Sequence, residues 1–361
     1  MDKEESVREM PGIGPTRAKS LEDAGYRTVS DLLSADFFDV IKVKGMGCKS
    51  TCSAFAYIGK DIKYQNMRLI ECNGFESAVI ENKEIFPWKK YKGKKEFVLQ
   101  PNEFNLEKTT VWSFPDRGDW ATHTPHYRGN WSPRVVRNVI ERYSKPGDTV
   151  LDPMVGGGTT AVECLLTGRN STSADINEGA IRITKNRLAM PENRANELPE
   201  SEHIQYVGDT RNLNLIENNS IDLIATHPPY VNIIRYTKLI DGDLSQISDY
   251  ELFFKEFRKA ILEYYRVLKE GKYCAILIGD THNKGHFVPI ANRLMIEFLR
   301  NGFVLKEDII KKEWNCESDR NLGKYANSDF LLTMHEHLYI FKKPTEQERK
   351  MYKNSSIRFF D

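Results

Sequence analysis

Long hydrophobic runs are absent from this sequence of 361 residues. The longest apolar run, residues 273–278, is far too short to span a bilayer, which argues against a membrane protein. The polar start MDKEESVREM lacks the apolar segment of a secretory signal peptide. Only six cysteines occur and they are scattered along the chain, so a disulfide framework is not expected. These absences predict a soluble, cytoplasmic protein of a reducing compartment.

Neither sign of charge predominates. The 52 Lys and Arg residues against 51 Asp and Glu residues leave a net charge of +1. This balance excludes a wholly basic nucleic-acid coat and an acidic solvating tail. With 40% hydrophobic and 11% aromatic residues the chain can bury a core. Its length exceeds one ordinary compact domain and predicts two or three.

Residues 1–65 predict a small all-α domain. Two glycine-containing turns, PGIGP at 11–15 and KGMG at 44–47, each lead into a helical pattern. The pair resembles a tandem helix-hairpin-helix domain, whose backbone amides hold a nucleic-acid phosphate without selecting a sequence. The candidate nucleic-acid-binding glycines are Gly12, Gly14, Gly45 and Gly47. A helical protein-contact module of the same shape is the alternative.

Residues 66–110 predict an extended, partly β connector. It contains a basic run in which aromatic rings alternate with lysines, including Lys89, Lys90 and Lys92. Such a run could follow a phosphate backbone while its rings stack on bases. A solvated hairpin tip is equally consistent with this composition.

From about residue 111 the pattern alternates between buried strands and amphipathic helices, which predicts a doubly wound, Rossmann-like α/β sheet. The expected strands are 149–151, 221–225 and 273–278, and the expected helices are 133–144, 158–168, 178–189, 249–269 and 287–301. Residues 303–311 and 337–342 predict two further strands at an antiparallel edge. The α/β domain is therefore expected over 111–343, followed by a charged, frayed tail over 344–361.

Chemically distinctive residues follow the predicted strands. The first strand leads into DPMVGGGTT at 152–160, where three glycines allow a ligand to approach the backbone. No Gly-Lys-Ser/Thr follows, which argues against a nucleoside-triphosphate loop, and Asp152 would repel a dinucleotide pyrophosphate. Two further strands are expected between residues 160 and 220. Asp175 ends the first of them, where it could accept hydrogen bonds from ribose hydroxyls, and Asp209 follows the other. THPPY at 226–230 follows the strand expected at 221–225. Together these strand ends describe a nucleoside-shaped site.

Three motifs in register carry a family resemblance. DPMVGGGTT at 152–160 is similar to a cofactor motif, Asp-Pro-Phe-x-Gly-Ser-Gly-Thr-Thr, and THPPY at 226–230 to a catalytic Ser/Asp/Asn-Pro-Pro-Tyr motif. YRGNWSP at 127–133 is similar to a third, cofactor-contacting motif. Over residues 111–343 the chain therefore resembles the S-adenosylmethionine-dependent amino-methyltransferases, which modify the exocyclic amine of cytosine or adenine in DNA.

The resemblance implies a role for each motif. The implied cofactor-binding residues are Asp152, Pro153, Gly156, Gly157, Gly158, Thr159, Thr160, Asp175, Asp209, Trp131 and Ser132. Among these, Asp175 would hold the ribose, Asp209 would hold the adenine amine, and the two threonines would cap the next helix. The implied catalytic residues are His227, Pro228, Pro229 and Tyr230. Tyr230 would stack on a flipped-out base, and a carbonyl of the proline turn would accept an amine hydrogen.

His227 departs from the family motif, which has Ser, Asp or Asn before the two prolines. A neutral imidazole still accepts one hydrogen bond, and the lack of the Asp or Asn typical of adenine enzymes slightly favours cytosine. The alternative is that His227 only packs against a neighbouring strand. The Pro-Cys dipeptide of carbon-5 cytosine methylases is absent. No metal site is expected, because HEH at 335–337 has no nearby Cys or His pair.

The predicted function is methyl transfer from S-adenosylmethionine to a base amine in double-stranded DNA. The expected context is a restriction-modification system, with a cognate restriction endonuclease as a candidate partner. One alternative is an RNA base amino-methyltransferase of the same fold. Another is a non-catalytic nucleic-acid-binding protein with a degenerate methyltransferase fold.

Overall fold

The computed structural model describes residues 5–11, 13–35, 40, 43–46, 54, 67–69, 78–80, 83–85, 97–237, 240–315 and 329–352. The strands in these ranges are β1 (Arg68–Leu69), β2 (Ala78–Ile80), β3 (Lys83–Ile85), β4 (Val111–Ser113), β5 (Thr149–Asp152), β6 (Asn170–Asp175), β7 (His203–Val207), β8 (Ile221–Thr226), β9 (Leu268–Gly279), β10 (Thr281–Asn283), β11 (His286–Val288), β12 (Val304–Lys312) and β13 (His335–Lys342). The helices are α1 (Pro15–Asp23), α2 (Val29–Ser34), α6 (Pro133–Tyr143), α7 (Thr159–Thr167), α8 (Glu178–Leu188), α9 (Glu192–Ala195), the 3-10 helix η1 (Leu244–Gln246), α10 (Tyr250–Val267), α11 (Ile290–Arg300) and α13 (Glu346–Tyr352).

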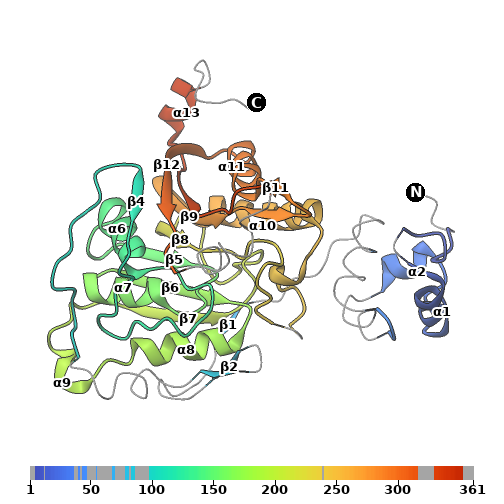
Figure 1. Ribbon diagram of the computed structural model, residues 1–361, viewed down its shortest axis with the longest axis horizontal. Helices are drawn as coiled ribbons and strands as arrows, with labels where there is room; N and C mark the ends of the chain where they lie inside the picture. Colours follow the sequence, from blue (N-terminus) through green and yellow to red (C-terminus); the bar gives the residue numbers. More distant parts are fainter. Residues whose placement is uncertain are drawn as a thin grey trace.

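One large sheet organises most of the described chain (Figure 1). Its strand order is β1-β7-β6-β5-β8-β9-β13-β12-β4. The five strands from β7 to β9 are parallel, whereas β13 is antiparallel to β9 and to β12. This arrangement confirms the predicted mixed α/β, Rossmann-like sheet, including the antiparallel pair formed by the last two predicted strands.

Helices cover both faces of this sheet, so neighbouring residues of one strand enter different cores. Leu223 of β8 and Leu277 of β9 pack in a cluster that includes α6. The next residues, Ile224 and Ile278, pack in a cluster that includes α10 and α11. Because both faces are covered, all six residues of β8 are buried, and Leu223 and Ile224 place apolar side chains on opposite faces.

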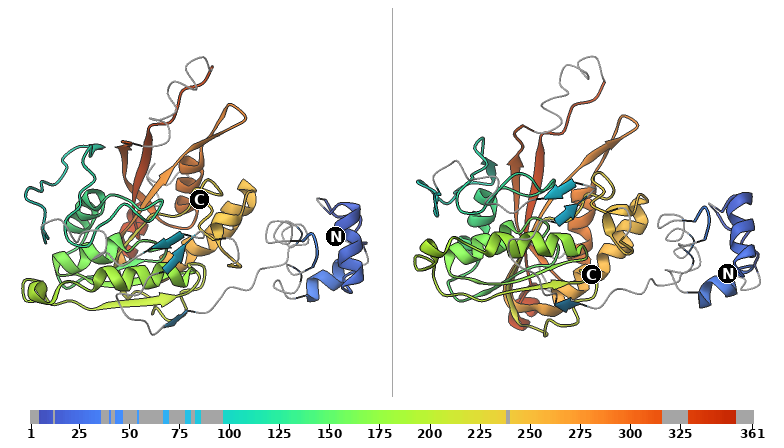
Figure 2. Two further views of the ribbon diagram at one scale, coloured as in Figure 1. Left: turned by 60° about the horizontal axis from the view of Figure 1, so that its bottom comes forward. Right: turned by 90° about the horizontal axis from the view of Figure 1, so that it is seen from below.

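The structure corrects two predicted elements after β9. Residues 287–289 were expected to begin a helix, but β10 and β11 form a hairpin there and α11 starts at Ile290. Figure 2 shows this hairpin projecting beyond the sheet. The tail was expected to be frayed, yet Glu346–Tyr352 form α13, whose Glu348 pairs with Lys342 and whose Arg349 pairs with Glu270. These ion pairs hold the start of the tail against the sheet domain.

A separate small lobe contains α1 and α2 (Figure 1). Gly14 is the N-cap of α1, and Gly25, with φ of +96°, follows its end. Thr28 and Asp31 form a capping box at α2. Arg17 Nε donates to the Gly45 carbonyl at 3.0 Å, which links α1 to the second glycine turn. The described lobe therefore has the helical character expected of the N-terminal domain.

Parts of the predicted connector join the sheet domain. β1 pairs with β7, and Leu99 is buried in a cluster with Trp120 and Val162. The proposed phosphate-contacting residues Gly12, Gly47, Lys89, Lys90 and Lys92 lie outside the described residues. The boundaries after residues 65, 110 and 343 stay predictions.

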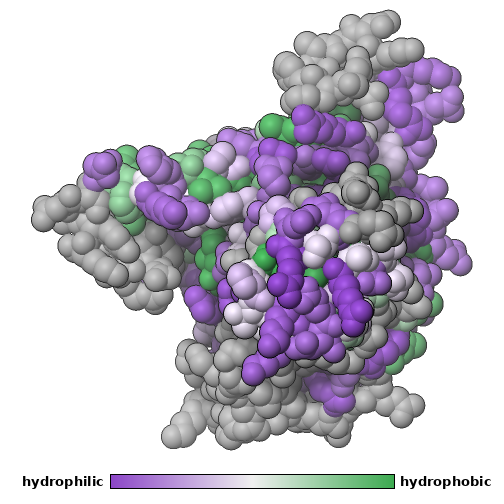
Figure 3. All heavy atoms as spheres, turned by 90° about the vertical axis from the view of Figure 1, so that its right-hand side faces the viewer, coloured by the Kyte–Doolittle hydropathy of each residue, from purple (hydrophilic) through white to green (hydrophobic). Residues whose placement is uncertain are grey.

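Hydrophilic side chains cover most of the described surface on the face shown in Figure 3. In the described ranges, no helix combines the length and apolarity that a membrane crossing requires.

Candidate active site

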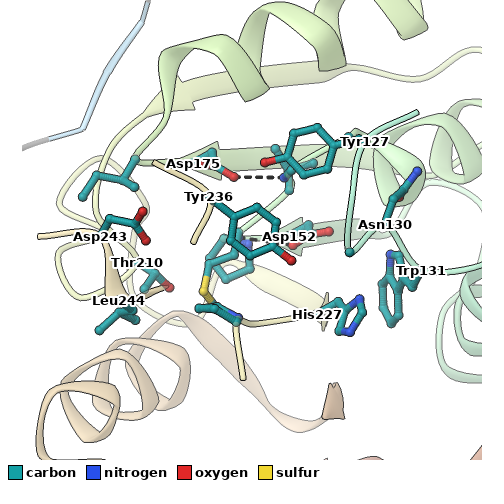
Figure 4. Close-up of a pocket in the computed structure, with 18 of the residues that line it drawn as sticks. Tyr127, Asn130, Trp131, Asp152, Asp175, Thr210, His227, Tyr236, Asp243 and Leu244 are labelled. Carbon is teal, nitrogen blue, oxygen red and sulfur yellow. Dashed lines mark hydrogen bonds between the residues drawn. The ribbon is translucent and has the colours of Figure 1, made fainter. Parts of the chain in front are cut away.

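A cavity of about 700 Å³ lies at the carboxyl ends of β5, β6 and β8 (Figure 4). β6 and β8 flank β5 on opposite sides, so this is the switch point at which doubly wound sheets bind ligands. Of the residues predicted from the motifs, the cavity is lined by Trp131, Asp152, Pro153, Gly156, Gly157, Asp175, Asp209, His227 and Pro229. Ser132, Gly158, Thr159, Thr160, Pro228 and Tyr230 are not among its lining residues.

Asp175 is held at the edge of β6 by two backbone amides. Its Oδ2 accepts from the Gly156 amide and its Oδ1 accepts from the Asn177 amide, both at 2.9 Å. A carboxylate has about four acceptor positions. The contacts within the described chain therefore leave about one acceptor position on each oxygen for a ligand.

Asp209 is buried beside Arg211. Its Oδ1 accepts from the Arg211 backbone amide and Nε, both at 2.9 Å, and its Oδ2 accepts from the Arg211 Nη2 at 2.6 Å. Arg211 is held in turn by Glu256, at 2.8 Å. This leaves Asp209 Oδ2 with about one acceptor position not used by contacts in the described chain.

The glycine run packs closely on its neighbours as well as facing the cavity. A Cβ at Gly156 or Gly157 would lie 2.9 Å from Tyr127, and one at Gly158 would lie 2.9 Å from Thr184. Gly158, with φ of +80°, is itself the N-cap of α7. Glycine is therefore needed here for close packing against Tyr127 and Thr184. At Gly156 and Gly157 it also leaves the backbone accessible to a ligand in the cavity.

The two threonines after this run do not cap α7, contrary to the prediction. The helix has no side-chain cap, because the left-handed Gly158 occupies the N-cap position and the threonines lie within the first turn. Thr160 donates to Asp152 Oδ2 at 2.5 Å, and Thr159 donates to the Asn130 side-chain oxygen. Both hydroxyls thus fix residues that line the cavity.

The segment before α6 supplies one wall of the cavity. Trp131 is buried and its ring centroid lies 6.0 Å from that of His227. Ser132 has a different place, because its hydroxyl accepts from the Arg134 amide and caps α6. Its Oγ also donates to the Arg117 carbonyl at 2.8 Å.

The His227-Pro228-Pro229-Tyr230 turn separates two cavities. His227 lines the 700 Å³ cavity and also a second cleft of about 2060 Å³, of which Pro228 and Tyr230 are lining residues. The backbone after the turn is strained, since buried Val231 has φ of +56°, a region that β-branched residues rarely adopt. This strained residue follows a turn whose side chains line the first cavity and the second cleft.

Tyr230 is fixed at both its ring and its hydroxyl. A Cβ at Gly279 would lie 2.6 Å from Tyr230 Cε2, so the ring occupies the space that this glycine leaves. The hydroxyl donates to Glu336 Oε1 and lies 2.5 Å from His227 Nε2. The ring is therefore held in one orientation at the second cleft.

Burial shifts the pKa values of the ionisable side chains around the first cavity. It raises the pKa of Asp152 to about 6 and the pKa of Asp175 to about 7. Burial also lowers the pKa of His227 to about 4, although Glu336 opposes the shift. At neutral pH His227 is therefore an uncharged imidazole that can accept a hydrogen bond.

The lining of this cavity is acidic. Asp152, Asp175, Asp209 and Asp243 all line it, and no lysine or arginine belongs to its described lining. Such a site favours a cation and disfavours a pyrophosphate. The described part of the chain also contains no group of three or more His, Cys, Asp or Glu side chains that could hold a metal ion.

The sequence matches the family described as DNA methylase over residues 29–186 and 221–359. The chain belongs to the DNA methylase family. Residues 4–50 match a helix-hairpin-helix tandem described as SAM-like. The methylase match confirms the predicted resemblance and, with it, the methyl donor S-adenosylmethionine. The second match confirms the predicted type of the N-terminal domain. Asp209 falls between the two matched segments of the methylase domain.

Curated relatives match this chain over part of their length. The type II methyltransferase M.MthZI of Methanothermobacter thermautotrophicus is 26% identical over 43% of this chain and 50% of its own. M.ScaI of Streptomyces caespitosus is 30% identical over 28% of this chain and 34% of its own. The DNA adenine methyltransferase YhdJ of Escherichia coli is 29% identical over 24% and 31%. The chain thus spans half or less of the length of these relatives.

Solved structures similar to this chain include two methyltransferases. A S-adenosylmethionine-dependent methyltransferase of Methanosarcina mazei is 16% identical, with a TM-score of 0.39, and the match covers 58% of this chain and 98% of that one. A methyltransferase of Pyrococcus furiosus is 14% identical, with a TM-score of 0.39, over 62% and 88%.

Sequence motifs missed the part of the first cavity's lining that follows the His227-Pro228-Pro229-Tyr230 turn. Tyr236, Gly242, Asp243 and Leu244 line the first cavity. The Tyr236 and Tyr127 rings stack with centroids 6.0 Å apart. Asp243 is buried and accepts from the Thr237 and Ser245 hydroxyls, at 2.6 and 2.8 Å. These residues lie between a strand and a helix, where no periodic pattern marks them.

Proposed function

We propose that this methylase transfers a methyl group from S-adenosylmethionine to the exocyclic amine of a base in double-stranded DNA. The observation that carries the proposal is the position of His227, which lines both cavities at the end of β8. The acidic cavity suits a cationic methyl donor, and the wider cleft suits a base turned out of the duplex. Amine and methyl group would meet at the His227-Pro228-Pro229-Tyr230 turn.

The fit of the acidic cavity to S-adenosylmethionine supports this proposal. The two acceptor positions left on Asp175 match the two ribose hydroxyls, and the one on Asp209 suits the adenine amine. Figure 4 shows Asp243 and Asp175 on one side of the cavity, with His227 and Trp131 on the other. When bound, the cofactor supplies an electrophilic methyl group on a positively charged sulfur. The backbone at Gly156 would face its methionine portion.

In this proposal the chain contributes positioning and electrostatics. A carbonyl of the Pro228-Pro229 turn accepts a hydrogen from the target amine, and this draws the nitrogen lone pair out of conjugation with the ring. Tyr230 stacks on the base, and its fixed ring keeps the amine facing the turn. No covalent bond to the enzyme is needed.

For the target base we propose cytosine N4, with adenine N6 as the alternative. His227 replaces the Asp or Asn of adenine enzymes, which favours cytosine. Against it, one relative of this chain has the name DNA adenine methyltransferase. The type II names of other relatives support a modification role beside a restriction endonuclease.

Removing residues 1–65 is expected to weaken DNA binding evenly across sequences, because hairpin amides contact phosphates. The salt dependence of binding should become shallower as those contacts are lost. Binding titrations at several salt concentrations, with a sizing measurement of both chains, test this. Equal affinities and equal salt slopes, together with a lost oligomer, would assign the lobe to protein contacts instead.

The proposed substrate is tested by expressing the chain in cells whose DNA lacks methylated amines. Nucleosides from their DNA and RNA are then compared by mass spectrometry, with Tyr230→Ala as the matched control. We expect N4-methylcytosine or N6-methyladenine in DNA from cells with the unaltered chain, and less of it in DNA from cells with Tyr230→Ala. Methylated bases confined to RNA would favour the RNA enzyme, and none in either polymer would favour a non-catalytic protein.

A further inference from the structure

A chain of four polar side chains links the catalytic turn to the antiparallel part of the sheet. Lys311 Nζ donates to Glu336 Oε2 at 2.6 Å, and the Tyr230 hydroxyl donates to Glu336 Oε1. Tyr230 Oη lies 2.5 Å from His227 Nε2. All four side chains are largely buried, with exposed fractions of 17% for Lys311, 8% for Glu336 and 13% for His227. Nothing in the motifs predicted this chain of contacts.

The register of three neighbouring strands brings these four side chains into contact. Lys311 of β12 is opposite Glu336 of β13, and Glu336 is opposite Gly279 of β9. Side chains of opposite residues point to the same face of a sheet. Because Gly279 has no side chain, the Tyr230 ring lies over it and the hydroxyl reaches Glu336. Any residue other than glycine at position 279 would place a Cβ against the Tyr230 ring and displace its hydroxyl from Glu336.

The protons shared among these four hydrogen-bonded side chains determine which nitrogen of His227 is protonated. Burial alone would raise the pKa of Glu336, but Lys311 and the other partners outweigh it and hold the pKa below its usual value. Glu336 is therefore an acceptor at both oxygens, and the single Tyr230 hydroxyl proton lies between Tyr230 and Glu336. The Tyr230 oxygen is then an acceptor toward His227. Only a proton on His227 Nε2 completes this contact.

With its proton on Nε2, the neutral ring has a lone pair on Nδ1. This atom is buried and no described residue donates a hydrogen to it, although the Gly129 backbone lies close enough to interact with the ring. A buried acceptor without a partner is costly, and such atoms occur where a ligand completes the contact. His227 lines both the acidic cavity and the wider cleft, so a base amine between them lies within reach of its ring.

We infer that Glu336, held by Lys311, is a positioning residue that keeps His227 in the Nε2-protonated tautomer, so that Nδ1 accepts a hydrogen bond from the target amine. This inference rests on the proposed function for the identity of the amine. His227 thereby takes the place of the Ser, Asp or Asn oxygen that the resembling methylases have at this position. The opposite tautomer would let His227 form a hydrogen bond with the Gly129 backbone. It would also leave His227 Nε2 and the Tyr230 oxygen, which are 2.5 Å apart, without a proton between them.

Nitrogen-15 NMR of the full chain labelled in its histidines tests the inference without substrate. At pH 7, where His227 is neutral, we expect its Nε2 to be protonated and its Nδ1 to be unprotonated. The spectrum of His227→Asn identifies the signals by their loss. A protonated Nδ1 in the unaltered chain would overturn the inference, whatever the enzyme methylates.

Glu336→Gln supplies the second test. The glutamine amide can donate to the Tyr230 oxygen, which turns the hydroxyl proton toward His227 and moves the imidazole proton to Nδ1. We expect this tautomer change together with a fall in kcat on the order of tenfold, while the affinity for S-adenosylmethionine is unchanged. Lys311→Arg, which keeps the charge beside Glu336, should retain the original tautomer and most of the turnover.

Asp308→Asn is the matched control, because Asp308 lies on the same strand as Lys311 but pairs with His337 at 3.0 Å. It should change neither the His227 signals nor kcat. An unchanged tautomer and unchanged kcat in a folded Glu336→Gln variant would contradict the positioning role. If no methylated amine forms with any nucleic acid, the proposed function fails while the tautomer measurement still reports on the network.

Discussion

Replacing Tyr230 by alanine is expected to lower methyl transfer by about 5- to 150-fold, since stacking a base on an aromatic ring contributes roughly 1–3 kcal/mol. The loss should appear in turnover on DNA, because Tyr230 lines the wider cleft and is not among the lining residues of the acidic cavity. Single-turnover kinetics and calorimetry of cofactor binding together measure this separation.

Two further variants separate the effects of the Tyr230 ring, its hydroxyl and its position. Tyr230→Phe keeps the ring and removes the bond to Glu336, so it should retain more activity than alanine. Gly279→Ala keeps Tyr230 but places a Cβ 2.6 Å from its ring, so it should lower turnover by displacing the ring. Unchanged turnover in Tyr230→Ala would move the base-binding site elsewhere.

Asp175→Ala is expected to weaken binding of S-adenosylmethionine by about 5- to 150-fold, because polar ribose atoms lose buried acceptors at about 1–3 kcal/mol. The Gly156 and Asn177 amides lose their partner as well, so folding of the variant must be checked by circular dichroism. Calorimetry gives the affinity. An unchanged affinity in a folded variant would remove Asp175 from the cofactor site.

The affinity for the cofactor should also depend on pH. Burial raises the pKa of Asp175 to about 7, so the carboxyl is largely protonated at pH 6 and largely ionised at pH 8. An ionised carboxylate accepts hydroxyl hydrogens better than a protonated one, so affinity should rise with pH, by up to about tenfold per pH unit below the pKa. Calorimetry from pH 5.5 to 8.5 measures this.

Asp175→Asn is the control for this pH dependence. It should abolish the rise near pH 7 and leave only the part that comes from Asp152, whose pKa burial raises to about 6. An equally steep rise near pH 7 in Asp175→Asn would assign the titration to another group.

Most of the parallel sheet could be predicted because its signals are local. β8 and the second half of β9 contain short apolar runs, and the strand ends carry glycine, aspartate or proline, which mark turns at a ligand-binding edge. The cavity accordingly brings together Asp152, Asp175 and His227, which are far apart in the sequence.

Short and long-range features could not be predicted in the same way. β4 and β11 have three residues each, too few for a periodic pattern. The contact between Tyr230 and Glu336 joins residues 106 positions apart and depends on the order and register of the strands. The threonine cap failed for a local reason, since Gly158 adopts the left-handed conformation that ends the loop.

The central claim is tested most directly with the purified full chain, duplex DNA and S-adenosylmethionine carrying an isotopically labelled methyl group. Digestion of the DNA and mass spectrometry of its nucleosides then locate the label. The account predicts labelled N4-methylcytosine or N6-methyladenine, and a slower gain of this label with Tyr230→Ala. Label on a carbon atom of a base, or in RNA but not in DNA under the same conditions, would contradict it.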